Sequence, residues 1–225
     1  MAYNIGYSEF ERKMSNDQIL RQLHICAALY NSHLDKRYLF ASVSLNGSMI
    51  ISEVVFKKRS FQHLVAIKSK LGAELFYDKC LKYNSECDEA LTVEECNSSY
   101  GHGRQDIIIK SVALPTLLKF SNPKDFKIGI QDKNTLYVNF DLGYGNRATL
   151  GFIRDGNNSY LVPNTLLPQG ISNYCTNTKP ISFILTDFDG EKYTTIYYEA
   201  KKNLVKDLSE TYDVIKEYYS ENIDV

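Results

Sequence analysis

The stretch EVVFKKRSFQHLVAIKSK, residues 53–70, holds the side chains best suited to chemistry. Lys57 and Lys58 begin a run of three bases, and His63 and Lys68 follow shortly after. An imidazole with an ordinary pKa of about 6.5 accepts and donates protons near neutral pH. Ammonium groups stabilise the charge that develops on a phosphate during its transfer. This combination indicates acid–base chemistry on a phosphate ester, with His63 as the proton carrier.

The periodicity of residues 60–71 predicts a helix with one apolar face. On that helix His63 lies at the edge of the apolar face, and Lys68 falls inside it. In a structural interpretation, Lys68 extends its ammonium to water and His63 is a boundary residue. In a chemical interpretation, the helix edge lines a cleft in which His63 titrates, and the bases near the helix N-terminus meet a phosphate. The spacing alone leaves both interpretations open.

Other polar residues follow apolar strand-like runs. Lys110 and Ser111 come after three isoleucines, where the lysine would neutralise a phosphate and the serine would bond to a phosphate oxygen. Ser111 is equally suited to cap a following helix. Arg147 and Arg154 bracket the run ATLGFI, and Ser182 lies in ISFIL. If the predicted sheet forms the floor of a substrate site, these three side chains would contact a phosphate backbone.

A glycine-flanked His102 with Arg104 nearby would supply a second proton carrier, although a polar surface loop has the same composition. The spacing of Cys80, Cys87, Cys96 and His102 matches no closed zinc motif. We therefore expect no metal site and no cofactor. The motifs of nucleotide-dependent enzymes, α/β-hydrolases and metalloproteases do not occur in the contexts that these enzymes require.

Several elements must position these residues. Ser15 provides a cap for an amphipathic helix over residues 16–33. Two β-prone runs around Asn46-Gly47 predict a tight hairpin. A short helix with Pro115 in its first turn is expected to follow Ser111. The remaining strand candidates are FKIGI, TLYVNFDL, ATLGFI, SYLV, ISFIL and YTTIYY.

The last residues, 201–225, carry one apolar stripe on an otherwise charged helix pattern. The fold class expected is α+β, with N-terminal helices packed on one twisted antiparallel sheet and a C-terminal amphipathic helix. We expect a single domain over residues 1–200, with the C-terminal helix either packed on it or used for contacts.

Composition adds limits on partners. A net charge of −1 and an isoelectric point near 6.4 give no overall attraction to nucleic acid, so any such contact needs a local basic patch. Five cysteines without regular spacing fit a reducing compartment. The polar N-terminus and the lack of a run of about 20 apolar residues predict a soluble, intracellular protein without a membrane partner. The oligomeric state is left open.

The order of these patterns resembles a phage-associated nuclease-like family, the fourth of several grouped with barnase, EndoU, colicin nucleases and RelE. In that family a helix ending in tyrosine leads to a hairpin, then to FKK, a spacer and an F-x-H-L helix. These correspond here to residues 56–58 and 61–64, with Ala66 where the family usually has glycine. IIIKSVALPTLLKF resembles its Lys-Ser element and short helix, and TLGFI and KPISFIL resemble its strands.

The resemblance implies a metal-independent endoribonuclease of a phage or mobile element, acting as a toxin or host-takeover factor in the bacterial cytoplasm. RNA would be the substrate and would be cleaved by attack of the ribose 2′-hydroxyl. His63 would transfer the proton, and Lys57, Lys58 or Lys68 would stabilise the phosphorane. The alternative is a catalytically silent member of the fold that captures a host, antitoxin or defence protein.

Overall fold

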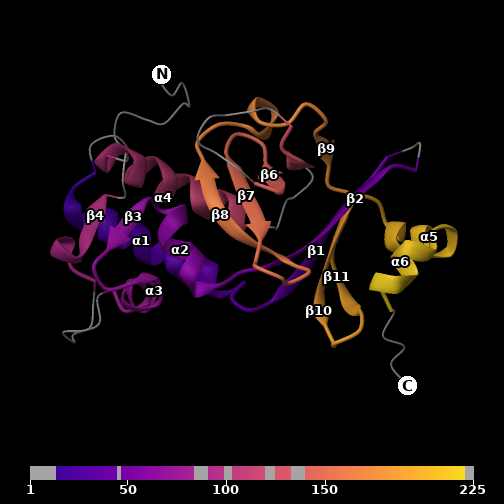
Figure 1. The fold of residues 1–225 in the computed structure, drawn as a ribbon, viewed down its shortest axis with the longest axis horizontal. Helices are drawn as coiled ribbons and strands as arrows, with labels where there is room; N and C mark the ends of the chain where they lie inside the picture. Colours follow the sequence, from indigo (N-terminus) through magenta and orange to yellow (C-terminus); the bar gives the residue numbers. More distant parts are fainter. Residues whose placement is uncertain are drawn as a thin grey trace.

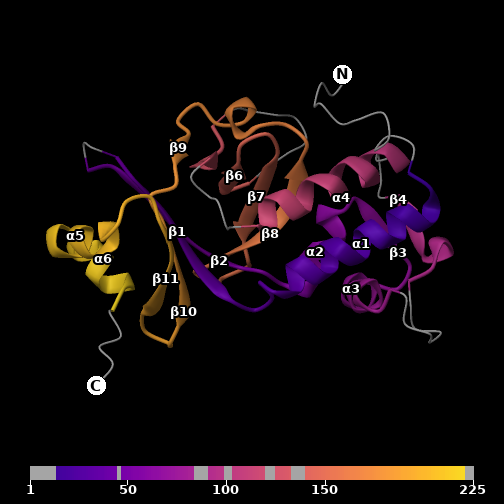
Figure 2. The ribbon, with the colours of Figure 1, turned by 180° about the vertical axis from the view of Figure 1, so that it is seen from behind.

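The computed structural model describes residues 14–44, 47–83, 91–98, 103–119, 125–132 and 140–220. Helices gather at both ends of the molecule, with the main sheet between them (Figures 1 and 2). Asn46, Cys87, His102 and most of the predicted strand TLYVNFDL lie outside the described residues. Within the described residues, no helix has both the length and the apolar character needed to cross a membrane.

The first helix, α1 (Asn16–Asn31), confirms the prediction from the N-terminal pattern. Ser15 and Gln18 form a reciprocal capping box, in which each side chain bonds to the backbone N–H of the other. The predicted apolar face is buried against the rest of the domain; its buried members are Ile19, Leu23, Cys26, Ala27 and Tyr30.

The predicted hairpin is also confirmed. Strands β1 (Arg37–Val43) and β2 (Met49–Val55) pair in antiparallel register. Side chains of β1 enter two separate cores, because successive residues of a strand point to opposite faces. Tyr38 and Phe40 join the core under α1–α4, whereas Leu39 and Ala41 join the core under the C-terminal helices.

Among the described residues, the main sheet has nine strands in the order β11-β10-β1-β2-β8-β7-β6-β5-β9. Its neighbours are antiparallel except β2 and β8, which pair in parallel at Val54 and Leu161. The α+β class is confirmed. The remaining strands are β5 (Lys127–Gly129), β6 (Leu142–Gly145), β7 (Thr149–Arg154), β8 (Leu161–Leu167), β9 (Lys179–Pro180), β10 (Phe183–Phe188) and β11 (Tyr193–Glu199).

The helix predicted over residues 60–71 is wrong in extent. Helix α2 spans only Lys58–Leu64, and Ala66 then takes a positive φ of 58°. A left-handed residue stops a right-handed helix, and it suits glycine better than alanine. The chain continues as β3 (Ile67–Ser69), which pairs with β4 (Cys96–Ser98) in a separate two-stranded sheet. Lys68 therefore belongs to a strand and not to the helix of His63.

Two more segments complete this end of the molecule. Helix α3 (Ala73–Leu81) packs against α1 and α2, burying Phe76, Tyr77 and Cys80. The 3₁₀ turn η2 (Val93–Glu95) precedes β4 at this end, whereas η4 (Ile171–Asn173) follows β8 and lies beside β5 and β6.

The short helix predicted after Ser111 is wrong in its start. Helix α4 runs from Arg104 to Leu118, so Pro115 lies near its end and not in its first turn. Proline has no N–H for the carbonyl four residues earlier, which is that of Ser111. Gln22 Nε2 and Cys26 Sγ of α1 donate to this carbonyl at 3.0 and 2.9 Å. The missing bond within α4 is thus replaced by contacts that fix α1 against it.

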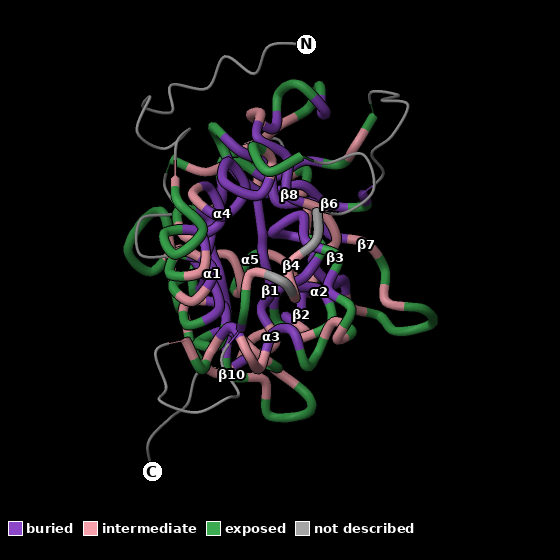
Figure 3. Tube along the Cα trace, turned by 90° about the vertical axis from the view of Figure 1, so that its left-hand side faces the viewer, coloured by how far each residue is buried: buried purple, intermediate pink, exposed green. Residues whose placement is uncertain are grey.

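The single C-terminal helix is replaced by two, α5 (Leu204–Thr211) and α6 (Asp213–Tyr218), because Tyr212 takes an extended conformation. The stripe still buries Val205 and Ile215 against the sheet face that carries Leu39 and Ala41. Buried segments run through the middle of the molecule, and exposed ones lie mainly at turns and outer helix faces (Figure 3).

Candidate active site

The two lysines that precede and begin α2 are each held by a carboxylate. Lys57 Nζ lies 2.8 Å from Oδ1 of Asp35, and Lys58 Nζ lies 2.8 Å from Oδ1 of Asp78 in α3. The hydrogen bond to Asp78 raises the pKa of Lys58. Both pairs are partly exposed, and such pairs contribute little to stability. A phosphate that binds either lysine must compete with a carboxylate already in place.

Arg59 makes a third pair, with Asp155 in the turn between β7 and β8. The side chain of Arg59 is 56% exposed, whereas that of Asp155 is only 16% exposed. The residue before this acid is Arg154, whose guanidinium donates to the carbonyl of Asn158 at 3.4 Å in the same turn. The turn therefore places Arg154 next in the chain to the acid that pairs with Arg59 of α2.

His63 lies in the last turn of α2 and is exposed to solvent. In the part of the chain that the structure describes, its imidazole has no hydrogen-bond or ion-pair partner. Phe61 and Leu64 on the same helix are fully buried. The helix is therefore anchored by its apolar side chains, while His63 faces water.

The other two described histidines have structural contacts. His24 Nδ1 lies 3.0 Å from the carbonyl of Cys80. His33 is buried, and its Nε2 lies 2.9 Å from the carbonyl of Leu118, so Nε2 donates. Its Nδ1 then accepts from the hydroxyl of Tyr38 at 2.8 Å. Burial lowers the pKa of His33 to about 4, against the opposing effect of the Leu118 carbonyl.

Lys110 and Ser111 lie in the middle of α4. The Ser111 hydroxyl is buried and donates to the carbonyl of Ile108 at 3.0 Å, so it caps no helix. The Lys110 residue is 7% exposed, but its Nζ is not among the fully buried unpartnered polar atoms of the described residues, so the ammonium reaches solvent at the end of a buried stem. Burial lowers the pKa of Lys110, with Asp106 acting in the opposite direction. A partly desolvated charge is costly, and such groups concentrate at functional sites.

Replacing Lys110 with Met should therefore raise the unfolding free energy at neutral pH by about 1 kcal/mol or less, since a partly desolvated charge is exchanged for an apolar chain of similar length. The unfolded chain holds the lysine proton more tightly than the fold does. The cost to the fold is thus present at neutral pH and disappears as pH rises toward the ordinary pKa of 10.5. Denaturant titration of both proteins measures the change. A loss of stability in Lys110→Met would contradict this account.

The last three sequence candidates lie on the sheet. Arg147 is exposed in the turn before β7, and Arg154 ends that strand. Ser182 accepts from the backbone N–H of Val43 at 2.9 Å, at the hairpin end of β1. The opposite end of β1 is about 20 Å away for a strand of this length. It lies beside the end of β2 from which the chain continues into α2. Arg154 is thus brought toward α2, whereas Ser182 is used to join β10 to β1.

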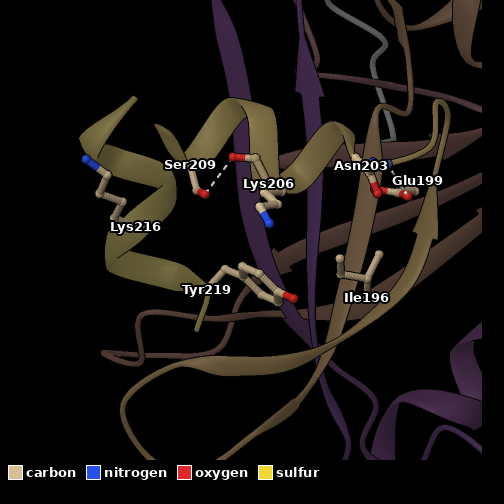
Figure 4. A pocket seen from close by; sticks show the side chains of 7 residues that line it. All are labelled: Ile196, Glu199, Asn203, Lys206, Ser209, Lys216 and Tyr219. Atoms are coloured by element: carbon tan, nitrogen blue, oxygen red, sulfur yellow. Dashed lines mark hydrogen bonds between the residues drawn. The ribbon is translucent and has the colours of Figure 1, made fainter. Parts of the chain in front are cut away.

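The structure also has two cavities that the sequence did not indicate. One of about 180 Å³ lies between β11, α5 and α6, and Figure 4 shows Lys206 directed into it while Lys216 points away. The other, of about 170 Å³, lies between α1, α4 and β3 and is mostly apolar. Arg104 and Cys96 line this second cavity. None of the other residues that the sequence suggested for chemistry lines either of these two cavities.

The acids that pair with the bases of α2 were missed by sequence reasoning. Asp35 follows α1, Asp78 lies in α3 and Asp155 follows β7, so no spacing in the sequence connects them. In a sequence with 27 acidic residues, only the fold reveals which of them face α2.

Comparison with known proteins supports one family. Residues 22–223 match the model of the family described as phage-Barnase-EndoU-ColicinE5/D-RelE like nuclease 4. Searches of curated proteins and of solved structures gave no significant match. The match covers the α2 segment, both cores and the C-terminal helices. The chain therefore belongs to the phage-Barnase-EndoU-ColicinE5/D-RelE like nuclease 4 family.

Proposed function

We propose that this nuclease-like protein is a metal-independent endoribonuclease of a phage or mobile element, and that it acts as a toxin or host-takeover factor on RNA in the bacterial cytoplasm. The observation that carries this proposal is the position of His63. It is the described histidine whose imidazole is exposed and not used by the fold, and it lies on the helix that begins with the basic run. Family membership supports a nuclease-like function, and the reaction class is our proposal.

In the proposed reaction the ribose 2′-oxygen attacks the adjacent phosphorus, and the bond from phosphorus to the 5′-oxygen breaks. One proton leaves the 2′-hydroxyl and another is delivered to the 5′-oxygen, giving a 2′,3′-cyclic phosphate and a 5′-hydroxyl. His63 carries one of these two transfers. Lys57, Lys58 or Lys68 stabilises the negative charge of the phosphorane, and Lys110 contributes positive charge from α4. Arg147 remains a candidate for a substrate contact because it is exposed, whereas Ser111 is buried and Ser182 is used within the sheet.

Replacing His63 with Gln should lower RNA cleavage by about 100-fold or more, the usual scale of general acid–base catalysis. The melting temperature should barely change, because the imidazole is exposed and the described fold makes no contact through it. Labelled RNA with excess chelator provides the assay, and the product ends are checked for cyclic phosphate.

His24→Gln is the matched control, because it removes a histidine that contacts the Cys80 carbonyl on α3. Cleavage by this variant should follow only its folded fraction. Equal activity of wild type and His63→Gln would refute the assignment of His63.

A catalytically silent binding module is the second candidate, and the pairing of all three α2 bases with carboxylates favours it. Such a protein would bind a host or defence protein and cleave nothing. Removing residues 201–225 is a poor test, because Val205 and Ile215 are core residues. Val214→Asp changes a side chain that is 37% exposed on α6 and leaves the core intact. Loss of a bound partner in this folded variant, with no cleavage by wild type, would support the second candidate.

A further inference from the structure

We infer that Arg59 and Arg154 together form a binding site for one backbone phosphate of single-stranded RNA, beside the start of α2. This inference rests on the proposed function and adds the element that holds the substrate. Both arginines contact one short turn between β7 and β8, although they are far apart in the sequence.

The turn is fixed from several directions. Asn158 donates to the carbonyl and the carboxylate of Asp155 at 2.9 and 3.3 Å, which closes the turn on itself. Asp141 accepts from the backbone N–H of Arg154 at 2.7 Å, and so holds the end of β7. Arg59 then reaches the turn from α2 through its pair with Asp155. The guanidinium groups are thus attached to one rigid support.

Both guanidinium groups keep donors available. A guanidinium has five N–H donors in a planar fork, which matches the oxygens of a phosphate. Arg59 directs one nitrogen to Asp155 and is 56% exposed, compared with 31% for Lys57 and 38% for Lys58. Arg154 is exposed, and its guanidinium makes one long bond of 3.4 Å. In the described chain these arginines are therefore the bases of this region least committed to protein contacts.

The nearby acids set the strength of the site. Asp155 pairs with Arg59, and Asp141 accepts from the backbone N–H of Arg154, so two carboxylates lie near these arginines and a phosphate meets no large excess of positive charge. Geometry then selects a phosphodiester, while the electrostatic attraction at long range is small. This agrees with a chain whose net charge is −1. Binding should accordingly be modest and sensitive to salt.

The test uses a labelled single-stranded oligoribonucleotide whose 2′-hydroxyls are methylated, so that it binds but cannot be cleaved. Fluorescence anisotropy gives the dissociation constant over a series of salt concentrations. For single strands, each phosphate contact contributes about 0.7 to the slope of log K against log salt. Arg59→Gln/Arg154→Gln should weaken binding and reduce that slope by about 0.7. Lys216→Gln, an exposed lysine paired with Asp213 on α6, removes one charge elsewhere and should leave the slope unchanged.

Three results would overturn the inference. The slope of the double variant would equal that of wild type if Arg59 only joins α2 to the turn. Lys216→Gln, which removes one charge where the double variant removes two, would reduce the slope by about half as much as the double variant if binding depended on total charge alone. Failure of wild type to bind the oligonucleotide at all would reject both the site and the proposed function. In the first two cases the proposed function stands, because cleavage is tested separately through His63.

Discussion

Lowering the pH from 7 to 5 should destabilise this protein by about 2 kcal/mol through His33 alone. The ordinary pKa of 6.5 applies to the unfolded chain, whereas burial lowers the value in the fold to about 4. Between these values the unfolded state binds a proton that the folded state excludes. Stability is therefore retained above pH 6.5, falls as pH decreases through 6.5, and reaches a total loss of about 3 kcal/mol below pH 4.

The physical reason is burial, which removes the charged imidazolium from water. The neutral ring is already hydrogen-bonded, because its Nε2–H donates to the Leu118 carbonyl and its Nδ1 accepts from the Tyr38 hydroxyl. Denaturant unfolding at pH 7 and pH 5 measures the effect. His33→Gln retains a donor and an acceptor in its amide but does not titrate. Its loss of stability between pH 7 and pH 5 should therefore be about 2 kcal/mol smaller than that of wild type. Equal pH dependence in both proteins would contradict the assignment.

Replacing Gly145 with Ala should cost about 3–5 kcal/mol, in the range that only backbone conflict or core disruption usually reaches. Gly145 ends β6 with a positive φ of 147°, and an added Cβ would lie 2.0 Å from the carbonyl oxygen of Ala148. Backbone must move to relieve this contact, which would disturb the turn that carries Arg147. For a domain of this size the melting temperature should fall by about 10 °C.

Gly156→Ala is the control for this prediction. Gly156 also has a positive φ, of 59°, but an added Cβ there would have no neighbouring atom within 4 Å. Only the left-handed strain of about 1–2 kcal/mol should then appear. Thermal unfolding of the two variants separates steric conflict from conformational preference, and similar losses in both would show that the carbonyl contact is unimportant.

Local patterns in the sequence predicted those elements whose stability is local. The capping box at Ser15 and the alternating runs around Gly47 determine α1 and the β1–β2 hairpin from neighbouring residues. Predictions were wrong where tertiary packing overrides such patterns. Ile107–Ile109 resemble a strand by composition, yet they lie in α4, which is buried on most sides and has no amphipathic period.

The candidate site shows the same division. His63 and the bases of α2 were identified because they are adjacent in the chain and match the family. The end of α2 at Leu64 was missed, because the left-handed residue just beyond it is Ala66, and alanine gives no signal of that conformation. Arg154 was suggested by its place at a strand end, but its link to Arg59 depends on a turn distant in sequence. Side-chain types thus suggest chemistry, and only tertiary structure shows which groups share a surface.

The position of β1 between β2 and β10 also affects how the chain folds during its synthesis. Leu39 on β1 pairs with Leu185 on β10, so one edge of β1 acquires its partner only when the later strand has been synthesised. At typical translation rates of about 5–20 residues per second, this interval lasts on the order of 10 s. During that time the hairpin presents an apolar strand with an open hydrogen-bonding edge, the feature most prone to pairing with other chains. Biogenesis of this nuclease-like protein is therefore most vulnerable to aggregation before its last third leaves the ribosome.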